Sequence, residues 1–282
     1  AGIIYDGEGL DTETMQQIAR EVRAPATCFV MSVKDREVSV RFFSTAQEYP
    51  MCGHGTLALM TGLIERGYLD IPCGESEEVY LRTPASSAAV AVNHQHDSRV
   101  EVMLNLEPAE FEATSIDQEF FERLFGASMD DLDSSLPVEY TRSDFSHMVV
   151  PMSSLQGVQS LSPDFGRLAD HCEEADIDTV MFFCHETIEV ENTVHCREFA
   201  PRAGTPEVPA AGTTNRALAC YLARHTVIQA EGDVPCVVRA EQGYEIQRPS
   251  LVTTRMILKR NLPTDIWVGG LATQVVRGQF SL

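Results

Sequence analysis

The feature that most constrains this chain is an internal repeat, in which a motif from the first half returns in the second half. Arg-Phe-Phe-Ser at 41–44, Glu48 and Pro-Met-Cys-Gly at 50–53 reappear as Arg-Glu-Phe-Ala at 197–200, Glu207 and Pro-Ala-Ala-Gly at 209–212. The two copies lie about one domain length apart, which is far too long for a solenoid repeat. We therefore predict two related halves, residues 1–110 and residues 111–282, with the last strand returning to the first half.

Length and charge bound what such a chain can do. Its 282 residues are enough for two domains, each with a core of its own. The formal net charge of −21 would repel a nucleic-acid backbone, so we expect no nucleic-acid partner. No run of the sequence approaches the ~20 apolar residues that span a bilayer, so we expect no membrane partner and a cytoplasmic protein.

The first copy of the motif stands where a turn becomes a helix, because apolar residues recur at helical spacing over residues 57–64. Gly53, His54 and Gly55 would present free backbone N–H groups at the positive end of the helix dipole, which suits a carboxylate. The same end of the helix would lower the pKa of the Cys52 thiol below the ~8.5 of a free thiol. The sequence therefore predicts Cys52 as a catalytic base.

The cysteines show no pattern of metal ligation or disulfide pairing. All eight are scattered through the chain without a Cys-x-x-Cys pair, so we expect neither a zinc site nor a disulfide framework. Cys28 and Cys184 lie inside strand-like runs, where a thiol packs as a small hydrophobic group. The same packing role is the alternative for Cys52, and its place beside Gly-His-Gly favours the reactive one.

The second copy supplies a matching turn without a thiol. Gly212, Thr213 and Thr214 would present N–H groups at the start of a second helix, and Ala211 stands where Cys52 stands in the first copy. If the two turns share one cleft, both helix N-termini bind a single small carboxylate. Glu207 precedes the second turn and is expected to meet a substrate ammonium group.

The pattern of elements favours an antiparallel sheet over a doubly wound one, because a doubly wound sheet needs a helix between most strands. We expect helices over residues 12–22, 57–64, 118–125 and 165–172, with a further helix after Gly212. We expect strands over residues 27–33, 37–43, 79–82, 88–92, 99–106, 148–152, 180–184, 193–199, 237–240, 245–247, 251–258, 266–268 and 273–276. Each half thus has many strands and about two helices.

Several motifs along the chain are specific in combination. They are Met-Gln-Gln-Ile-Ala-Arg-Glu at 15–21, Arg-Phe-Phe-Ser-Thr at 41–45, Cys-Gly-His-Gly-Thr-Leu-Ala at 52–58, Arg-Glu-Phe-Ala-Pro at 197–201, Gly204 with Glu207 and Pro209, Gly243 with Arg-Pro-Ser at 248–250, and Val-Gly-Gly-Leu-Ala at 268–272. Together they resemble the phenazine-biosynthesis PhzF-like family, which shares one fold with diaminopimelate epimerase and proline racemase. The resemblance implies an α+β fold of two pseudo-symmetric domains, each a β-barrel-like, mostly antiparallel sheet around a central helix. It also implies an active site between the domains and no cofactor.

The chain departs from the family pattern at three acid or base positions. Ala26 stands where the isomerases of the family that act on a dihydrohydroxyanthranilate have a catalytic glutamate, and Val208 replaces an expected aspartate. Ala211 replaces the second cysteine of the racemases of this fold. Stereoinversion by a two-base route needs a base on each face of the α-carbon, and only Cys52 remains.

These observations leave more than one function open. The first is a cofactor-independent isomerase, or a dehydratase, acting on a small carboxylate-bearing amino or hydroxy acid with Cys52 as its one base. The second is an inert binding protein on the same scaffold. His54 either holds substrate or relays a proton, or it only caps the helix. Glu48 is expected to be structural, and Arg41 and Arg197 are expected to be paired arginines at the surface or between the domains. We expect a homodimer.

Overall fold

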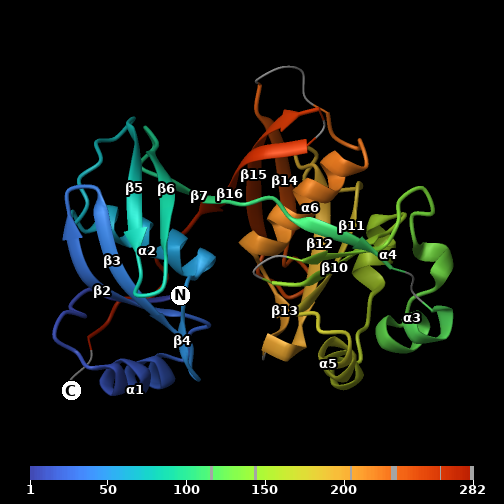
Figure 1. Cartoon of the computed structure of the whole chain (residues 1–282), viewed down its shortest axis with the longest axis horizontal. Coiled ribbons are helices and arrows are strands. Elements are labelled where there is room, and N and C mark those ends of the chain that lie inside the picture. The colour runs from blue at the N-terminus through green and yellow to red at the C-terminus, as the bar shows by residue number, and fades with distance from the viewer. Residues whose placement is uncertain (115–116, 143–144, 204, 230–233, 261, 280–282) are drawn as a thin grey trace. The chain divides into compact units, whose positions relative to one another are not determined.

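The computed structural model of the chain describes residues 1–114, 117–142, 145–203, 205–229, 234–260 and 262–279 (Figure 1). Gly204, one of the residues that carry the family resemblance, lies outside the described residues. The chain divides into two compact units, which are Ala1–Asn105 with Gly269–Leu282 (unit 1) and Leu106–Val268 (unit 2). None of the helices that the structure describes is both long and apolar enough to cross a membrane.

Unit 1 is one sheet with two helices. Its elements are β1 (Gly2–Ile4), α1 (Thr12–Val22), β2 (Thr27–Lys34), β3 (Glu37–Phe43), β4 (Glu48–Tyr49), α2 (Gly53–Glu65), β5 (Ser76–Arg82), β6 (Ser87–His94) and β7 (Val100–Leu106). The strands pair in the order β1-β2-β3-β5-β6-β7, with β4 paired to β3. The β1–β2 and β3–β5 pairs are parallel, and the other pairs are antiparallel.

Unit 2 repeats this arrangement after an insertion. The insertion is β8 (Glu110–Ala113), α3 (Gln118–Phe125) and β9 (Glu139–Arg142). There follow β10 (His147–Pro151), α4 (Leu155–Ser160), α5 (Phe165–Glu174), β11 (Thr179–Cys184), β12 (Val194–Ala200), β13 (Thr205–Val208), α6 (Gly212–Arg224), β14 (Cys236–Gln242), β15 (Ser250–Lys259) and β16 (Leu262–Leu271). The order β10-β11-β12-β14-β15-β16, with β13 paired to β12, matches the order of unit 1 strand for strand.

The two motif helices are the central elements of their units. Every residue of α6 from Thr214 to Ala223 is buried, and α2 is buried from Leu59 to Ile64. A surface helix would bury one stripe only, so burial on all sides means that the sheet curves around the helix, as Figure 1 shows for α6. The residues around α6 include Val149, Met181 and Phe183 of two neighbouring strands.

Two strands predicted from the sequence are wrong. Residues 245–247 form a turn, because Gly243 adopts a positive φ of 82° and its carbonyl accepts the Arg248 N–H at 2.9 Å. Residues 273–276 are in no strand, and Val275 and Val276 are 88% and 82% exposed, so their apolar side chains have no sheet face to pack on. The other predicted strands and helices lie within observed ones to within a few residues at their ends.

Candidate active site

The first copy of the motif forms the turn that leads into α2. Cys52 caps this helix in an extended conformation (φ −145°, ψ 109°) without a side-chain cap bond. Its carbonyl oxygen accepts the Thr56 N–H at 2.9 Å and the Thr56 hydroxyl at 2.8 Å, which fixes the first turn. The N–H groups of Gly53 and His54 precede the first intrahelical bond and are the donors that a small anion would use.

Gly55 lets the sulfur of Cys52 sit against the helix. A Cβ atom at this position would lie 3.0 Å from Cys52 Sγ, 3.1 Å from Phe42 Cε1 and 3.2 Å from Cys28 Sγ. The Cys28 thiol in turn donates to the Gly55 carbonyl at 3.5 Å. Any side chain at Gly55 would therefore displace a thiol or the Phe42 ring, so packing alone requires glycine here. At Gly53, by contrast, a Cβ atom would meet nothing within 4 Å.

The predicted activation of the thiol is wrong in this structure. Burial raises the pKa of Cys52 from 9.0 to about 11, and the opposing hydrogen bond from the Gly55 backbone does not offset it. The helix N-terminus therefore acts on a thiol that the core has removed from water, and desolvation is the larger effect. Cys52 is a protonated thiol at neutral pH, and its thiolate, once formed, is a stronger base than that of a free cysteine.

His54 lies beside this thiol, with Nδ1 and Nε2 at 3.6 and 3.8 Å from Cys52 Sγ. The residue is exposed at the surface, and partial desolvation of its ring lowers its pKa. The imidazole is therefore neutral above pH 7 and places no positive charge beside Cys52. A neutral imidazole at this distance is a candidate to pass a proton between the thiol and a bound molecule.

The second copy folds into the same turn at the start of α6. Ala211 caps the helix with φ −135° and ψ 115°, close to the angles of Cys52, and makes no side-chain cap bond. Its carbonyl accepts the Asn215 N–H at 3.1 Å and the Asn215 side-chain amide at 2.8 Å, as the Cys52 carbonyl accepts both groups of Thr56. The N–H groups of Gly212, Thr213 and Thr214 thus begin a helix in the way predicted from the sequence.

Each copy also contains an arginine–glutamate pair between adjacent strands. Arg41 donates to both carboxylate oxygens of Glu48 at 2.8 and 2.7 Å, and Arg197 donates to both oxygens of Glu207 at 2.9 and 2.8 Å. The second pair is the more buried, since both its side chains are 7% exposed. Glu207 therefore has its charge neutralised by Arg197, and this contact, unforeseen in the sequence, makes it a group that positions β13.

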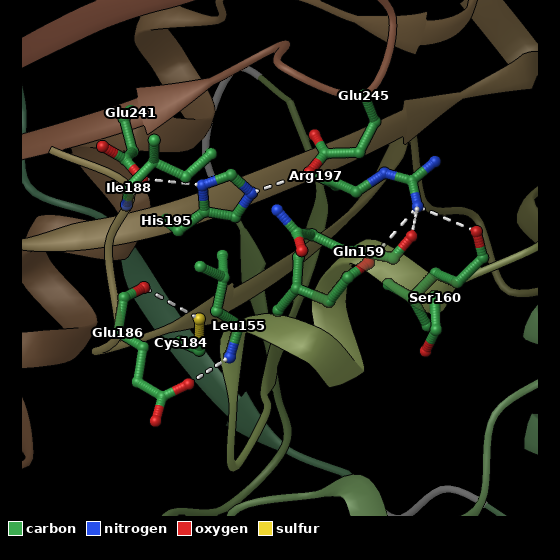
Figure 2. Close-up of polar contacts among 12 residues, drawn as sticks. Leu155, Gln159, Ser160, Cys184, Glu186, Ile188, His195, Arg197, Glu241 and Glu245 are labelled. Atoms are coloured by element: carbon green, nitrogen blue, oxygen red, sulfur yellow. Dashed lines mark hydrogen bonds and ion pairs between the residues drawn. The ribbon is translucent and has the colours of Figure 1, made fainter.

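Arg197 also holds the end of α4, because its Nη1 donates to the carbonyl oxygens of Val158, Gln159 and Leu161. Figure 2 shows this guanidinium beside the chain at Gln159 and Ser160. The guanidinium thereby ties α4, β12 and β13 together ahead of α6. The arginine is paired, as the sequence predicted, but it is a buried residue with these partners in unit 2, whereas a surface or interdomain position was expected.

The sequence reasoning missed a buried carboxylate–imidazole–carboxylate cluster formed by β12, β14 and the turn that follows β14. His195 lies between Glu241 and Glu245, with Nδ1 at 2.8 Å and Nε2 at 2.9 Å from their oxygens (Figure 2). Burial alone would lower the pKa of His195, and the hydrogen bonds to the two carboxylates more than offset it and raise the pKa. Glu241 also accepts the backbone N–H groups of Ile188 and Glu189. The charged cluster therefore anchors the loop between β11 and β12.

The three residues that depart from the family pattern have apolar side chains, which cannot act as an acid or a base. Ala26 is fully buried, and Val208 and Ala211 are partly buried on either side of the turn into α6. Among the described residues, no group of His, Cys, Asp and Glu side chains could hold a metal ion. Of the predicted site residues, unit 1 brings Cys52, His54 and the two glycines together, and unit 2 brings Gly212, Thr213 and Thr214 together.

The chain is similar to known proteins over almost its whole length. The sequence profile of PhzC-PhzF, described as phenazine biosynthesis-like protein, matches residues 1–278. An uncharacterised isomerase of Clostridium acetobutylicum is 27% identical over 287 residues, with 100% of this chain and 92% of that protein covered. A trans-2,3-dihydro-3-hydroxyanthranilate isomerase of Pseudomonas chlororaphis is 26% identical over 281 residues, with 99% of this chain and 92% of that protein covered.

Solved structures are also similar to this chain. A PhzF-family phenazine biosynthesis protein of Bacillus anthracis superposes with a TM-score of 0.84 at 26% identity, covering 95% of this chain and 88% of that one. A probable proline racemase of Agrobacterium radiobacter superposes with a TM-score of 0.57 at 13% identity, covering 96% and 83% of the two chains. The latter likeness shows the fold alone. The α+β fold class predicted from the sequence is confirmed.

Proposed function

Because the chain belongs to the PhzC-PhzF family of phenazine biosynthesis-like proteins, we propose that it is an isomerase that moves a proton on a small amino or hydroxy acid, with Cys52 as its base. The observation that carries the proposal is the pair of equivalent helix-capping turns, one of which holds a thiol. Relatives over the full length of the chain are named isomerases, which supports this reaction class. The reaction needs no cofactor.

In this proposal the two turns bind one substrate carboxylate in a shared cleft. Removing a proton from the α-carbon of a carboxylate leaves an enediolate, whose extra negative charge must be stabilised. The N–H groups of Gly53 and His54 on one side, and of Gly212, Thr213 and Thr214 on the other, are the donors that do so, whereas the Gly55 N–H bonds to the Cys52 sulfur. These backbone donors are held in place by their helices, so no reorganisation is needed as charge develops.

Cys52 supplies the only base, so the proton leaves and returns on one face of the substrate. The thiolate takes a proton from carbon, the double bond shifts, and the resulting thiol returns the proton to another carbon of the same face. Ala211 has no group that can protonate the opposite face. The proposal is therefore a shift of a double bond or a proton, without racemisation, and His54 assists by relaying the proton.

A second candidate is a binding protein without catalysis, which the neutral residues at Ala26, Val208 and Ala211 and the protonated Cys52 favour. The two candidates differ in whether solvent hydrogen enters a bound molecule. A panel of small amino, imino and hydroxy acids is incubated with the protein in D₂O, and deuterium uptake at carbon is followed by NMR.

The isomerase is expected to label one substrate at a single face, and the Cys52→Ser variant is expected to abolish the labelling. Cys73→Ser is the matched control, because Cys73 is an exposed thiol of the same unit and lies outside the motif. Binding of a panel acid without any exchange would support the binding protein instead. Racemisation as fast as exchange would contradict the one-base mechanism and would require a second acid, such as His54.

A further inference from the structure

The two motif helices differ in what lies beneath their first turns. The repeat matches Phe42 of β3 with Glu198 of β12, and Gly55 of α2 with Thr214 of α6. In unit 1 the Phe42 ring lies 3.1 Å from the place that a Gly55 Cβ would occupy. In unit 2 the Thr214 hydroxyl donates to Glu198 Oε1 at 2.5 Å. Unit 1 thus has an apolar ring against a glycine at the place where unit 2 has a carboxyl group against a hydroxyl.

Glu198 is the centre of a polar network within the core. Gln242 of β14 donates from Nε2 to Glu198 Oε2 at 3.3 Å and to the Val208 carbonyl at 2.7 Å. The Asn215 amide donates to Gln242 Oε1 at 2.9 Å. Glu198, Asn215 and Gln242 are all 1% exposed or less. The network therefore holds the chain immediately before α6, at Val208, and the first turn of α6 in one arrangement.

None of the described side chains that bond to Glu198 is a cation. The Thr179 hydroxyl bonds to Glu198 and lies 2.8 Å from His147 Nδ1, and burial lowers the pKa of His147 to about 3. His147 is thus neutral, and the described residues give Glu198 no ion pair. Burial raises the pKa of Glu198, while its bonds to Thr214, Thr179 and Gln242 lower it. A buried carboxyl group without a counter-charge is costly for the fold, so hydrogen bonding is its compensation.

We propose that Glu198 is the positioning residue of the substrate-binding turn of α6. Through Thr214 and Gln242 it fixes the turn from Val208 to Asn215, and thereby the direction of the N–H groups of Gly212 and Thr213. This inference rests on the proposed function for what the N–H groups bind, but the ordering of the turn can be measured without any substrate. In unit 1 the packing of Phe42 against Gly55 fixes the first turn of α2 in the same way.

The test is amide hydrogen exchange, followed by mass spectrometry, on peptides that cover residues 208–215. Glu198→Ala removes the acceptor of Thr214 and of Gln242, and one lost hydrogen bond corresponds to about tenfold faster exchange where opening is local. We expect that increase, or more, at the bonded amides of residues 208–215, such as the Asn215 N–H that donates to the Ala211 carbonyl, with the other peptides of unit 2 unchanged. Glu241→Gln is the matched control, because Glu241 is an equally buried carboxylate that holds the loop of Ile188 and Glu189 instead.

A paired variant tests the proposal where Glu198→Ala fails to fold. Glu198→Phe with Thr214→Gly places the Phe42 and Gly55 pair of unit 1 into unit 2, and it is expected to recover slow exchange at residues 208–215. Faster exchange spread evenly over unit 2 in the variants of Glu198, or the same pattern in Glu241→Gln, would overturn the proposal.

Once the deuterium panel has identified a substrate, the kinetic constants of a Glu198 variant give a second test. Glu198→Gln keeps an acceptor for Thr214 and loses the one that Gln242 uses, so kcat is expected to fall about tenfold with little change in KM, because the N–H groups act on the developing enediolate. A change in KM alone would contradict the assigned role. If the panel yields no substrate, the proposed function fails, and the exchange experiment still decides the role of Glu198.

Discussion

The reactivity of Cys52 is the property that the structure predicts most directly. Its pKa of about 11 lies two units above the ordinary value of 9.0, so at any pH below 9 the thiolate is about a hundredfold rarer than in an unfolded chain. At pH 7 this amounts to roughly one thiolate in ten thousand molecules. The thiolate is the nucleophile, so alkylation should rise tenfold per pH unit up to about pH 11.

Alkylation by iodoacetamide is measured from pH 7 to 11 by mass spectrometry of the peptide that contains Cys52, with the denatured chain as reference. Limited access to a buried thiol scales every rate by the same factor, whereas the pKa sets the pH at which the rate levels off. A rate that still rises about tenfold between pH 9 and pH 10 therefore reports the raised pKa independently of access. A plateau at or below pH 9 would refute the conclusion that desolvation outweighs the helix N-terminus at this site.

The same pKa governs catalysis and stability. If the thiolate is the base, kcat/KM should increase tenfold per pH unit from pH 7 to about 10, as long as substrate ionisation stays constant. For stability, a thiol with a raised folded pKa contributes fully below the unfolded value of 9.0, and the contribution is lost as the pH rises through about 11. A bell-shaped rate profile centred near neutral pH would contradict Cys52 as the unaided base.

Three further outcomes are expected, all measured by urea unfolding. Gly55→Ala should lower the free energy of unfolding by about 1–3 kcal/mol because its Cβ overlaps two thiols and a ring, whereas Gly53→Ala, into open space, should cost nothing. Arg197→Ala should lower the free energy of unfolding by about 3–5 kcal/mol, because it leaves a buried carboxylate unpaired. Arg41→Ala, in the more exposed pair, should lower it by about 1 kcal/mol or less. Equal losses in the two variants would contradict this reasoning. The stabilisation from protonated His195 should be complete below pH ~6.5 and lost as the pH rises through the raised folded pKa, so a His195→Gln variant should lack this pH dependence.

Much of the architecture could be predicted because local patterns and the repeat agree. Helix α1 was predicted with its observed bounds, since its cap at Asp11, its apolar spacing and its end at Arg23 are all local. The start of α6 followed from its likeness to α2, although its own first turn has no sequence signal beyond Gly212. The failed strand at 245–247 shows the opposite case, where one glycine with a positive φ decides the conformation.

The candidate site was predicted in its backbone and less well in its side chains. The turns at Cys52 and Ala211 are properties of short segments, so the sequence was enough to indicate them. The pKa of Cys52 and the partner of Glu207 depend on what other strands bring near, which the sequence does not display. The N–H clamp, the shared cleft, the homodimer and the cytoplasmic location stay predictions.

The polar core residues of β12 were the hardest to foresee. His195 and Arg197 alternate with Cys196 and Glu198 along a strand that is buried on both faces. A strand with charged residues at alternate positions ordinarily indicates one face in water. Here each charged group has its partner on another strand or helix, so only the fold reveals why the core accepts them.

The chain passes between the two units twice, since Gly269–Leu282 belongs with Ala1–Asn105. Within unit 1 the backbone at Gly269 comes so close to β7 that a Cβ atom would overlap the Val102 carbonyl. On the ribosome, the first hundred residues therefore emerge long before the segment that completes their sheet. Unit 2 ends at Val268, so the residues that close its sheet and those that complete unit 1 are made together along β16, and until then unit 1 has an open strand edge at β7. A nonsense codon near residue 265 would therefore release a chain in which neither unit has its complete last strand, a prime substrate for chaperones.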